Sequence, residues 1–295
     1  MPERIYGQRE PMENEAMEHT LETQAIAIWP QEKPYLRRIF PRSGLDVLDV
    51  GCGTGEISSR VLREFSPRTV TGIDLAEVNL RRAESRFSPE EYPGLSFRQG
   101  DAASMQFPDD GFDAALCRHM LQAVPDPHAV VREMIRVVRP GGWVYFLAED
   151  YGMLFFHPTR RDTDEFFLEY GGKAAARTGS NLRHGRTMPA ELTSLGCSDL
   201  EVHYLCIDTL RVDRRLLAQI FIHWRDGFEG WISMNSGYPL EDVRDRFNDM
   251  IECTLREDGY AVWLIPSISA RVTAEAKKRA AASRLAVTGT RRQDH

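Results

Sequence analysis

Three glycines in close succession, Gly51, Gly53 and Gly55, carry the first chemical signal in this sequence. They follow the apolar run "LDVLDV" and precede "EISSRVLREF", which has the apolar spacing of a helix. Glycine lets the backbone adopt positive φ and approach a ligand without a Cβ in the way. The amides that open the next helix can then face a polar or anionic group. We therefore expect a ligand to bind against the backbone of this turn.

Two common phosphate-binding patterns do not fit the turn. The dinucleotide fingerprint GxGxxG needs a third glycine where Glu56 or Ser58 stands, depending on the register. A Walker loop needs Gly-Lys-Ser/Thr after the turn, and no such sequence follows. A nicotinamide dinucleotide or a nucleoside triphosphate is therefore not the expected ligand.

Strands and helices alternate around the turn. We expect strands at "LDVLDV", "TVTGIDL", "LSFRQGD", "FDAALCRH" and "WVYFLAED", with helices of about ten residues between most of them. Such alternation predicts a parallel sheet that is covered by helices on both faces. Sheets of this kind bind ligands beyond the carboxyl ends of their strands, and the glycines lie at such an end.

Both flanks of this core are expected to contain helices. Residues 11–40 have helical apolar spacing, and Pro30 predicts a break into two helices at Trp29-Pro30. After Asp150 the alternation fails; helices are expected again at "MPAELTSLG", "RRLLAQIFIHW" and "EDVRDRFNDMIECTL", with late strands at "DLEVHYLCID" and "YAVWLIPSIS". We divide the chain into an N-terminal helical cap (1–43), a core (44–150), lid insertions with closing strands of the same domain (151–270) and a basic, partly disordered tail (271–295).

The string "VLDVGCGTG" resembles motif I of the class I S-adenosylmethionine-dependent methyltransferases. Further family positions recur in order at later strand ends, in "GIDLAE", "QGDAASMQF" and "CRHMLQAVPD". The resemblance covers roughly residues 45–150 and is closest to the small-molecule group that includes ubiquinone-type and natural-product enzymes. It implies an α/β fold, a Rossmann-like seven-stranded sheet with helices on both faces, plus an N-terminal helical cap and late helical insertions. The implied cofactor is S-adenosyl-L-methionine, and the product is S-adenosyl-L-homocysteine.

The resemblance implies how the nucleoside would be bound. Asp74 would accept hydrogen bonds from both ribose hydroxyls, which suits a carboxylate with two oxygens. Leu75 would lie against the adenine. Asp101 would accept from the adenine amino group, and the amide of Ala102 would serve the ring.

The resemblance also implies how the amino-acid end would be bound. Asp49 and Gly51 would bind the ammonium, and Arg118 would head the segment along the methionine portion. Gly53 and Gly55 would complete the backbone cradle. Any of the acids taken singly could instead be a strand-end carboxylate that caps the next helix.

A base near the strand ends would complete a methyl-transfer site. The sulfonium already makes the methyl group electrophilic, so the protein must hold a nucleophile in line with the carbon–sulfur bond and exclude water. A nitrogen or oxygen nucleophile often needs a base to remove its proton. The candidate catalytic residues are His119 after the fourth strand, and Tyr151 and His157 after the fifth, where Glu149 and Asp150 also lie. Each could instead have a surface or packing role.

Composition and net charge limit the kinds of partner that we expect this chain to bind. The 295 residues carry a formal net charge of −7, which argues against nucleic acid as the main partner. No signal peptide and no apolar run long enough to cross a membrane is recognisable. Five scattered cysteines without a CxxC pair predict reduced thiols in a cytoplasmic protein and no metal site.

The expected activity is methyl transfer to a nitrogen or oxygen of a small molecule, with carbon less favoured. The chain lacks the Asn/Asp-Pro-Pro-aromatic motif of amino-methylating DNA enzymes, the Pro-Cys of cytosine-5 enzymes and the cysteine pairs of arsenite methylators. One alternative is a regulatory or assembly protein that binds the cofactor without methylating. Another is an enzyme acting on protein or RNA through the arginine-rich "ARTGSNLRHGR" or the basic tail. The acceptor and the oligomeric state stay open.

Overall fold

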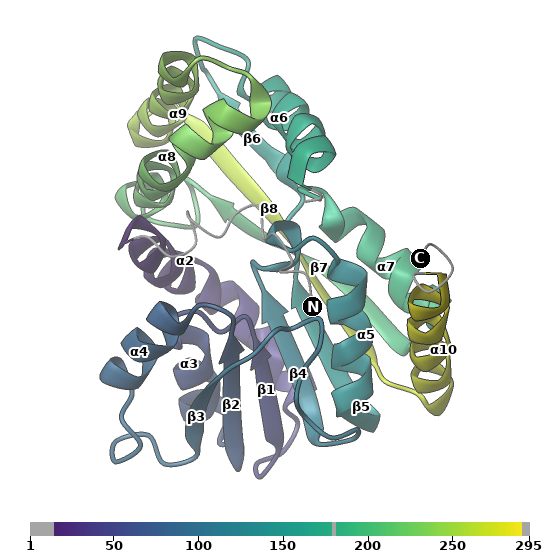
Figure 1. The fold of residues 1–295 in the computed structure, drawn as a ribbon. Helices are drawn as coiled ribbons and strands as arrows, with labels where there is room; N and C mark the ends of the chain where they lie inside the picture. The colour runs from purple at the N-terminus through teal and green to yellow at the C-terminus, as the bar shows by residue number, and fades with distance from the viewer. Residues whose placement is uncertain (1–14, 179–180, 291–295) are drawn as a thin grey trace.

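The structure, a computed structural model, describes residues 15–178 and 181–290. Its strands form one eight-stranded sheet in the order β3-β2-β1-β4-β5-β8-β6, with β7 also paired to β8 (Figure 1). The first five strands are parallel, and β8 runs antiparallel to β5, β6 and β7. The strands are β1 (Asp46–Val50), β2 (Thr69–Asp74), β3 (Leu95–Gln99), β4 (Phe112–Arg118), β5 (Val138–Leu147), β6 (Leu154–His157), β7 (Ser198–Asp208) and β8 (Tyr260–Arg271).

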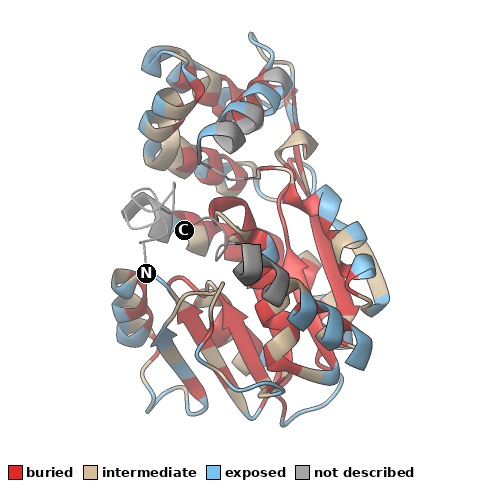
Figure 2. Ribbon diagram, turned by 45° about the vertical axis from the view of Figure 1, so that its right-hand side comes forward, coloured by how far each residue is buried: buried red, intermediate tan, exposed pale blue. Residues whose placement is uncertain are grey.

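Helices cover both faces of this sheet, as the α/β prediction requires (Figures 1 and 2). One core cluster lies between the sheet and α2, α3, α8 and α9, and the other between the sheet and α5, α7 and α10. The helices are α2 (Glu15–Ile39), α3 (Glu56–Phe65), α4 (Glu77–Arg86), α5 (Pro127–Val137), α6 (Thr163–Thr178), α7 (His184–Ser194), α8 (Arg214–Ser236), α9 (Leu240–Leu255) and α10 (Ala274–Thr290). Two short 3-10 helices, Leu121–Ala123 and Tyr151–Met153, follow β4 and β5.

Strand β1 shows how the sequence pattern produces this architecture. Val47 and Leu48 are both fully buried, but they belong to the opposite core clusters. A strand covered on both faces needs apolar side chains at successive positions, which is the pattern of "VLDV". Asp49 interrupts that pattern next to the carboxyl end of the strand, where the glycine turn (residues 51–55) begins.

The predicted break at Trp29-Pro30 is wrong, because α2 is one helix with Pro30 and Pro34 inside it. A proline in a helix removes one backbone hydrogen bond and strains the preceding turn. Here tertiary packing compensates, since Ala25, Ile28 and Leu36 of the same helix are fully buried. Local propensity alone could not show this burial.

The prediction of seven strands missed β6. This four-residue strand pairs with Tyr260–Trp263 of β8, while β5 pairs with residues 267–271 of the same strand. β5 and β6 therefore lie end to end along β8. The side chains of β6 alternate, with Leu154 and Phe156 buried and Phe155 and His157 exposed. In the apolar run "MLFF" this period of two is hidden.

The start of the basic tail is ordered as α10, which lies beside α5. Ala276 and Ala280 are buried in the core cluster on that face, so small side chains allow a close helix contact. The predicted disorder at the end of the tail concerns residues 291–295, which lie outside the described residues. Across the described part of the chain, every helix is too short or too polar to cross a lipid bilayer.

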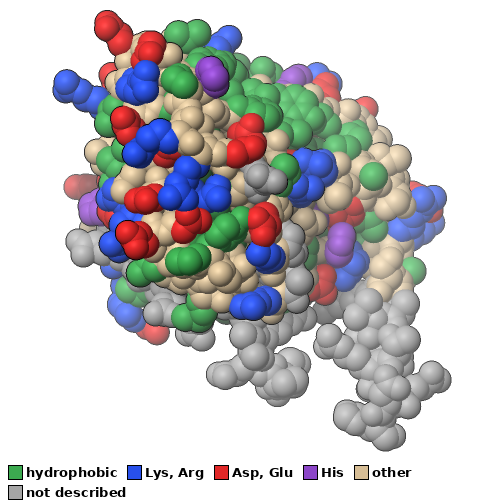
Figure 3. Space-filling model, turned by 90° about the horizontal axis from the view of Figure 1, so that it is seen from above, with side chains coloured by type: hydrophobic (Ala, Val, Ile, Leu, Met, Phe, Trp, Pro, Cys, Tyr) green, Lys and Arg blue, Asp and Glu red, His purple; other side chains and the backbone are tan. Residues whose placement is uncertain are grey.

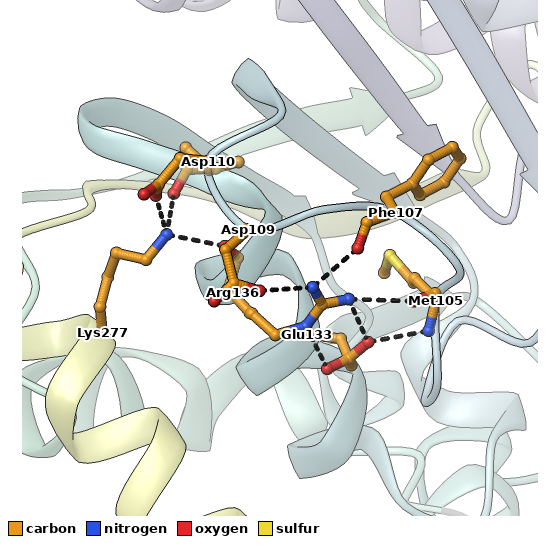
Figure 4. Close-up of polar contacts among 8 residues, drawn as sticks. Met105, Phe107, Asp109, Asp110, Glu133, Arg136 and Lys277 are labelled. Carbon is orange, nitrogen blue, oxygen red and sulfur yellow. Dashed lines mark hydrogen bonds and ion pairs between the residues drawn. The ribbon is translucent and has the colours of Figure 1, made fainter.

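Hydrogen bonds with two charged side chains of α5 hold the loop that follows β3 (Figure 4). Arg136 of α5 donates to the carbonyls of Met105 and Phe107 and to the carboxylate of Glu133, at 2.8 to 2.9 Å. Glu133 in turn accepts the amide of Met105 at 2.8 Å. Because this network satisfies buried backbone groups, it holds the loop that begins at Asp101 against the sheet edge.

Candidate active site

The glycine turn lies at the carboxyl edge of the sheet, at the end of β1. Gly53 has φ of 53° and its amide donates to the Asp74 carboxylate at 2.9 Å. Gly55 has φ of 78° and precedes the first residue of α3. A Cβ on Gly55 would lie 2.5 Å from the ring of Phe97, so both the conformation and the space require glycine. The turn therefore presents bare backbone at the start of a helix.

A cavity of about 30 Å³ borders this turn, and we name it the glycine-turn cavity. It contains a carboxylate and a hydroxyl that an ammonium ion could contact. Asp49 is 2% exposed, and the Thr54 hydroxyl is buried without a partner among the described residues. The lining also includes Gly51 and Glu56 from the turn, Arg118 and His119 from the end of β4, and Leu21 and Gln24 from α2. These groups fit the amino-acid end of an S-adenosyl donor.

Asp49 is held in an environment that disfavours its charge. Burial raises the pKa of Asp49 from 3.8 to about 6, although the Ser58 hydroxyl donates to its carboxylate at 2.6 Å and Arg118 opposes the shift. The native state therefore binds a proton more tightly than the unfolded chain does. As pH rises from about 4 to about 6, this difference lowers the stability of the native state.

Replacing Asp49 by asparagine is therefore expected to stabilise the fold at pH 7.5. The gain should be roughly 2–3 kcal/mol in the free energy of unfolding, and it should vanish near pH 4, where the native carboxyl is already neutral. Urea unfolding of both proteins at the two pH values measures it. The affinity for S-adenosyl-L-homocysteine should fall in the same variant, because its ammonium loses a carboxylate partner. A variant that is less stable at both pH values would contradict this account of Asp49.

Asp74 ends β2 beside the turn. Its carboxylate accepts the amides of Gly53 and Ala76, both at 2.9 Å, while burial raises its pKa. Asp74 therefore shapes the turn and accepts the amide of Ala76, the residue before α4. Its role toward a ligand stays a prediction.

The residues expected to contact an adenine lie at the next strand ends. Leu75 is a large apolar side chain with 36% of its surface exposed. Asp101 accepts the amide of Ala103 at 2.8 Å, and Ala102 is half-buried beside it. Leu75, Asp101 and Ala102 do not line the glycine-turn cavity. They also do not line the second cavity, which adjoins it and is described below. Their ligand contacts therefore stay predictions.

Arg118 is engaged by a residue that the sequence did not reveal. Its guanidinium forms two hydrogen bonds of 2.8 Å with the carboxylate of Glu32, which is fully buried in α2. Tyr145 of β5 donates to the same carboxylate at 2.8 Å, and Ser267 of β8 donates to Tyr145 at 3.1 Å. This buried chain of contacts joins the N-terminal helix to the sheet. Arg118 still borders the glycine-turn cavity.

A second cavity, of about 60 Å³, adjoins the first and is named here the aromatic chamber. The two share Leu21, Gln24 and His119 in their linings. The polar lining of the chamber consists of Thr20, Gln24, His119, Gln122 and Glu149. Its aromatic wall consists of Tyr151, Phe167, Tyr170, Trp224, Phe228 and Phe247. Helix α2 contributes to both cavities, so the predicted helical cap lies over the junction between them.

His119 and Glu149 form a buried pair at this junction. Nδ1 of His119 lies 2.5 Å from a carboxylate oxygen of Glu149, and the two side chains are 6% and 2% exposed. The pair forms because β4 and β5 are neighbours, with Arg118 aligned to Leu147 and the amide of His119 bonded to the carbonyl of Leu147 at 3.0 Å. Sequence reasoning placed Glu149 near the site but did not pair it with His119.

The pair can act as a base. In a neutral His119 that donates from Nδ1 to the carboxylate of Glu149, Nε2 keeps its lone pair. Nε2 is buried without a partner among the described residues. His119 also has φ of 52°. Residues other than glycine rarely adopt this backbone conformation, and it often marks a functional position.

The other two catalytic candidates lie differently. Tyr151 is in the aromatic chamber, with its ring 5.6 Å from Trp224 and 5.7 Å from Phe167. Burial raises the pKa of Tyr151 above its ordinary value of 10, so its hydroxyl stays protonated and serves as a wall rather than a base. His157 lies at the exposed end of β6 and lines neither cavity.

Two arginines of the stretch "ARTGSNLRHGR" have bonding partners within the protein. Arg186 pairs with the buried carboxylate of Asp150 at 2.5 Å, and Arg177 donates to the carbonyl of Met234 at 2.8 Å. Seen from above, acidic and basic side chains are interspersed over the surface instead of forming a basic field (Figure 3). This face does not resemble a surface for RNA.

Comparisons with known proteins concern mainly the core. Residues 48–146 match the methyltransferase domain family. Over 118 residues the chain is 37% identical to a ubiquinone biosynthesis O-methyltransferase of Albidiferax ferrireducens, covering 40% of this chain and 46% of that protein. Over 117 residues it is 33% identical to a demethylmenaquinone methyltransferase of Desulfitobacterium hafniense, covering 39% and 46%. The chain thus spans a little under half the length of these curated relatives.

Solved structures share the fold over most of the chain. A phosphoethanolamine N-methyltransferase of Haemonchus contortus, solved with phosphomonomethylethanolamine and S-adenosylhomocysteine, superposes with a TM-score of 0.55 at 19% identity. That match covers 85% of this chain and 56% of the other. The [4+2]-cyclase SpnF superposes with a TM-score of 0.51 at 22% identity, covering 83% of both chains. At such identities the fold alone is shared.

Proposed function

We propose that this chain, whose residues 48–146 match the methyltransferase domain family, is a class I methyltransferase that transfers a methyl group from S-adenosyl-L-methionine to a nitrogen or oxygen of a small molecule. The observation that carries the proposal is the junction of the two cavities at His119. The glycine-turn cavity offers groups for the amino-acid end of the donor. The aromatic chamber offers a mostly apolar site for an acceptor on the other side of His119.

The residues divide the work as follows. The donor supplies an electrophilic methyl group on its sulfonium. The amides of the glycine turn, Asp49 and Asp74 bind and orient the donor, with Leu75, Asp101 and Ala102 at its adenine end. Nε2 of His119 takes the proton of the acceptor, and Glu149 fixes the tautomer and stabilises the imidazolium that forms. The acceptor nucleophile then bonds to the methyl carbon, and the electron pair of the breaking bond stays on sulfur.

Calorimetry with S-adenosyl-L-homocysteine tests the donor site. Replacing Asp74 by alanine should weaken binding at least 100-fold, because the ribose loses its acceptor and the amide of Gly53 loses its partner. Replacing Asp46 by alanine is the matched control, since this acid lies at the amino end of β1, whereas Asp74 lies at the carboxyl end of β2. If the Asp74 variant binds as tightly as the control, Asp74 does not hold the donor.

A methyl-transfer assay with isotopically labelled donor tests the reaction itself. Methylated product from a panel of small amines, phenols and carboxylic acids supports the proposal. Tight binding of donor and product without any transfer would favour the alternative of a non-methylating protein. The superposition on the cyclase SpnF gives that alternative weight, because its name shows that this fold is not restricted to methyl transfer.

We also propose a cytoplasmic location. All five cysteines are free, and Cys52, Cys117 and Cys253 are buried. Reduced thiols of this kind are typical of proteins in a reducing compartment.

A further inference from the structure

The chemical class of the acceptor can be inferred from three buried polar atoms that belong to residues lining the aromatic chamber. Nε2 of His119, Oε1 of Gln122 and Oε2 of Glu149 are all buried, and none has a partner among the described residues. Gln122 spends its amide group on the carbonyl of His119 at 2.8 Å, which leaves its oxygen to accept. With Nδ1 of His119 donating to Glu149, all three atoms are hydrogen-bond acceptors.

A ligand that complements these atoms must bring donors. Buried polar groups in native proteins almost always have partners, so three neighbouring orphan acceptors indicate a missing group with several N–H or O–H bonds. A single hydroxyl donates once. A primary ammonium donates three times, which matches the number of acceptors.

Charge points to the same class. Among the residues that line the chamber, Glu149 is the one acidic side chain, and neither lysine nor arginine is present. A carboxylate or phosphate on the acceptor would therefore face an acid with no compensating cation, in a site where burial strengthens the repulsion. An ammonium would instead be attracted by Glu149.

The wall of the chamber favours a cation as well. The ring of Tyr151 packs against both Phe167 and Trp224, with centroids 5.7 and 5.6 Å apart, and all three residues line the chamber. Aromatic faces attract ammonium groups and tolerate their alkyl substituents, especially where water is excluded. Tyr151 keeps its proton, as its raised pKa shows, so the wall itself adds no negative charge.

The size of the chamber excludes a large ring in this conformation. Its volume is about 60 Å³. An engineered cavity that binds benzene measures about 150 Å³. A short headgroup fits this space better than an aromatic ring does.

The relatives do not determine this choice. The family match ends at residue 146, and most residues that line the chamber lie beyond it, in α6, α8, α9 and the segment after β5. The match therefore includes His119 and Gln122, but not Glu149 or the aromatic wall.

We propose that the acceptor is a small aliphatic amine, bound in the aromatic chamber as its ammonium by Glu149, Gln122 and the aromatic wall. This inference rests on the proposed methyl transfer. One ammonium proton passes to Nε2 of His119, which frees the nitrogen lone pair. A new N–C bond to the methyl group forms, and the electron pair of the broken S–C bond goes to sulfur. The products are the methylated ammonium, the neutral thioether and a protonated His119, which returns its proton to water.

Three small probes of closely matched size, which respect the volume of the chamber, test the proposal on the full chain: ethylamine, ethanol and acetate. Binding is measured by calorimetry with S-adenosyl-L-homocysteine present, and methyl transfer is measured separately with labelled donor. We expect the amine to bind at least tenfold more tightly than the alcohol, the carboxylate not to bind, and the amine to be methylated on nitrogen. Equal binding of amine and alcohol, or binding of the carboxylate, would overturn the proposal.

A pair of variants shows whether Glu149 recognises the charge. Glu149→Gln should weaken amine binding at least tenfold and change the affinity for S-adenosyl-L-homocysteine by no more than a few-fold, and a cooperative melting transition shows that the variant is folded. Glu169→Gln is the matched control, an exposed carboxylate of α6 that pairs with Lys173 and does not line the chamber. Unchanged amine binding in Glu149→Gln would also overturn the proposal.

The outcomes separate this inference from the proposed function. If phenols such as catechol are methylated and amines are neither bound nor methylated, methyl transfer stands and the amine proposal falls. If the amine binds in a Glu149-dependent way but no probe is methylated, the amine-binding chamber stands and methyl transfer falls.

Discussion

Replacing His119 by asparagine is expected to slow methyl transfer by about 10²- to 10⁴-fold, the usual contribution of a general base. Asparagine tolerates the positive φ at this position better than most residues, so the backbone should keep its shape. The affinity for S-adenosyl-L-homocysteine should stay within a few-fold of the parent protein. Single-turnover rates with labelled donor measure the loss.

His157→Asn is the matched control for this experiment. His157 was an equally good candidate in the sequence, but it is exposed at the end of β6 and lines neither cavity. Its variant should retain the parental rate. A large loss in His157→Asn, or a normal rate in His119→Asn, would show that the base has been misassigned.

Replacing Glu32 by alanine is expected to lower the free energy of unfolding by about 3–5 kcal/mol, the range for removing one partner of a buried ion pair. Arg118 would keep its charge in a buried position, and Tyr145 would lose the acceptor of its hydroxyl. Urea unfolding followed by circular dichroism and tryptophan fluorescence measures the change. A loss below 1 kcal/mol would mean that water reaches Arg118 in place of Glu32.

A double variant separates the charge from the packing. Changing Glu32 and Arg118 together to methionine removes both charges and fills similar volume, so most of the lost stability should return. Binding of S-adenosyl-L-homocysteine should nevertheless weaken in the double variant, because Arg118 borders the glycine-turn cavity. If the double variant is no more stable than Glu32→Ala, the large loss does not come from an unpaired charge.

The part of the site that could be predicted from the sequence is local. Gly53 and Gly55 could be recognised because the conformation of a tight turn depends on each residue itself. Asp49, Asp74 and Asp101 could be placed at one sheet edge because parallel strands align their carboxyl ends. Their roles toward the donor stay proposals until the binding experiments are done.

The contacts between distant segments could not be predicted. Glu32 and Arg118 are 86 residues apart, and His119 and Glu149 are 30 apart. Nothing in the local pattern around Glu32 distinguishes it from a surface acid on a helix. The continuity of α2 through Pro30 has the same cause, because burial of that helix outweighs the local preference for a break.

The amino-acid pattern by itself therefore determined the α/β class, the backbone turn at residues 51–55 and the edge of the sheet where a ligand would bind. These follow from side-chain periodicity and from the conformational freedom of glycine, which are properties of short segments. Only the tertiary structure decided that α2 lies over two adjoining cavities and that Glu149 orients His119. It also decided which aromatic residues, from four separate segments after β5, enclose the aromatic chamber. These choices depend on which strands are neighbours and on which faces of the helices are buried, and both are settled when the whole chain packs.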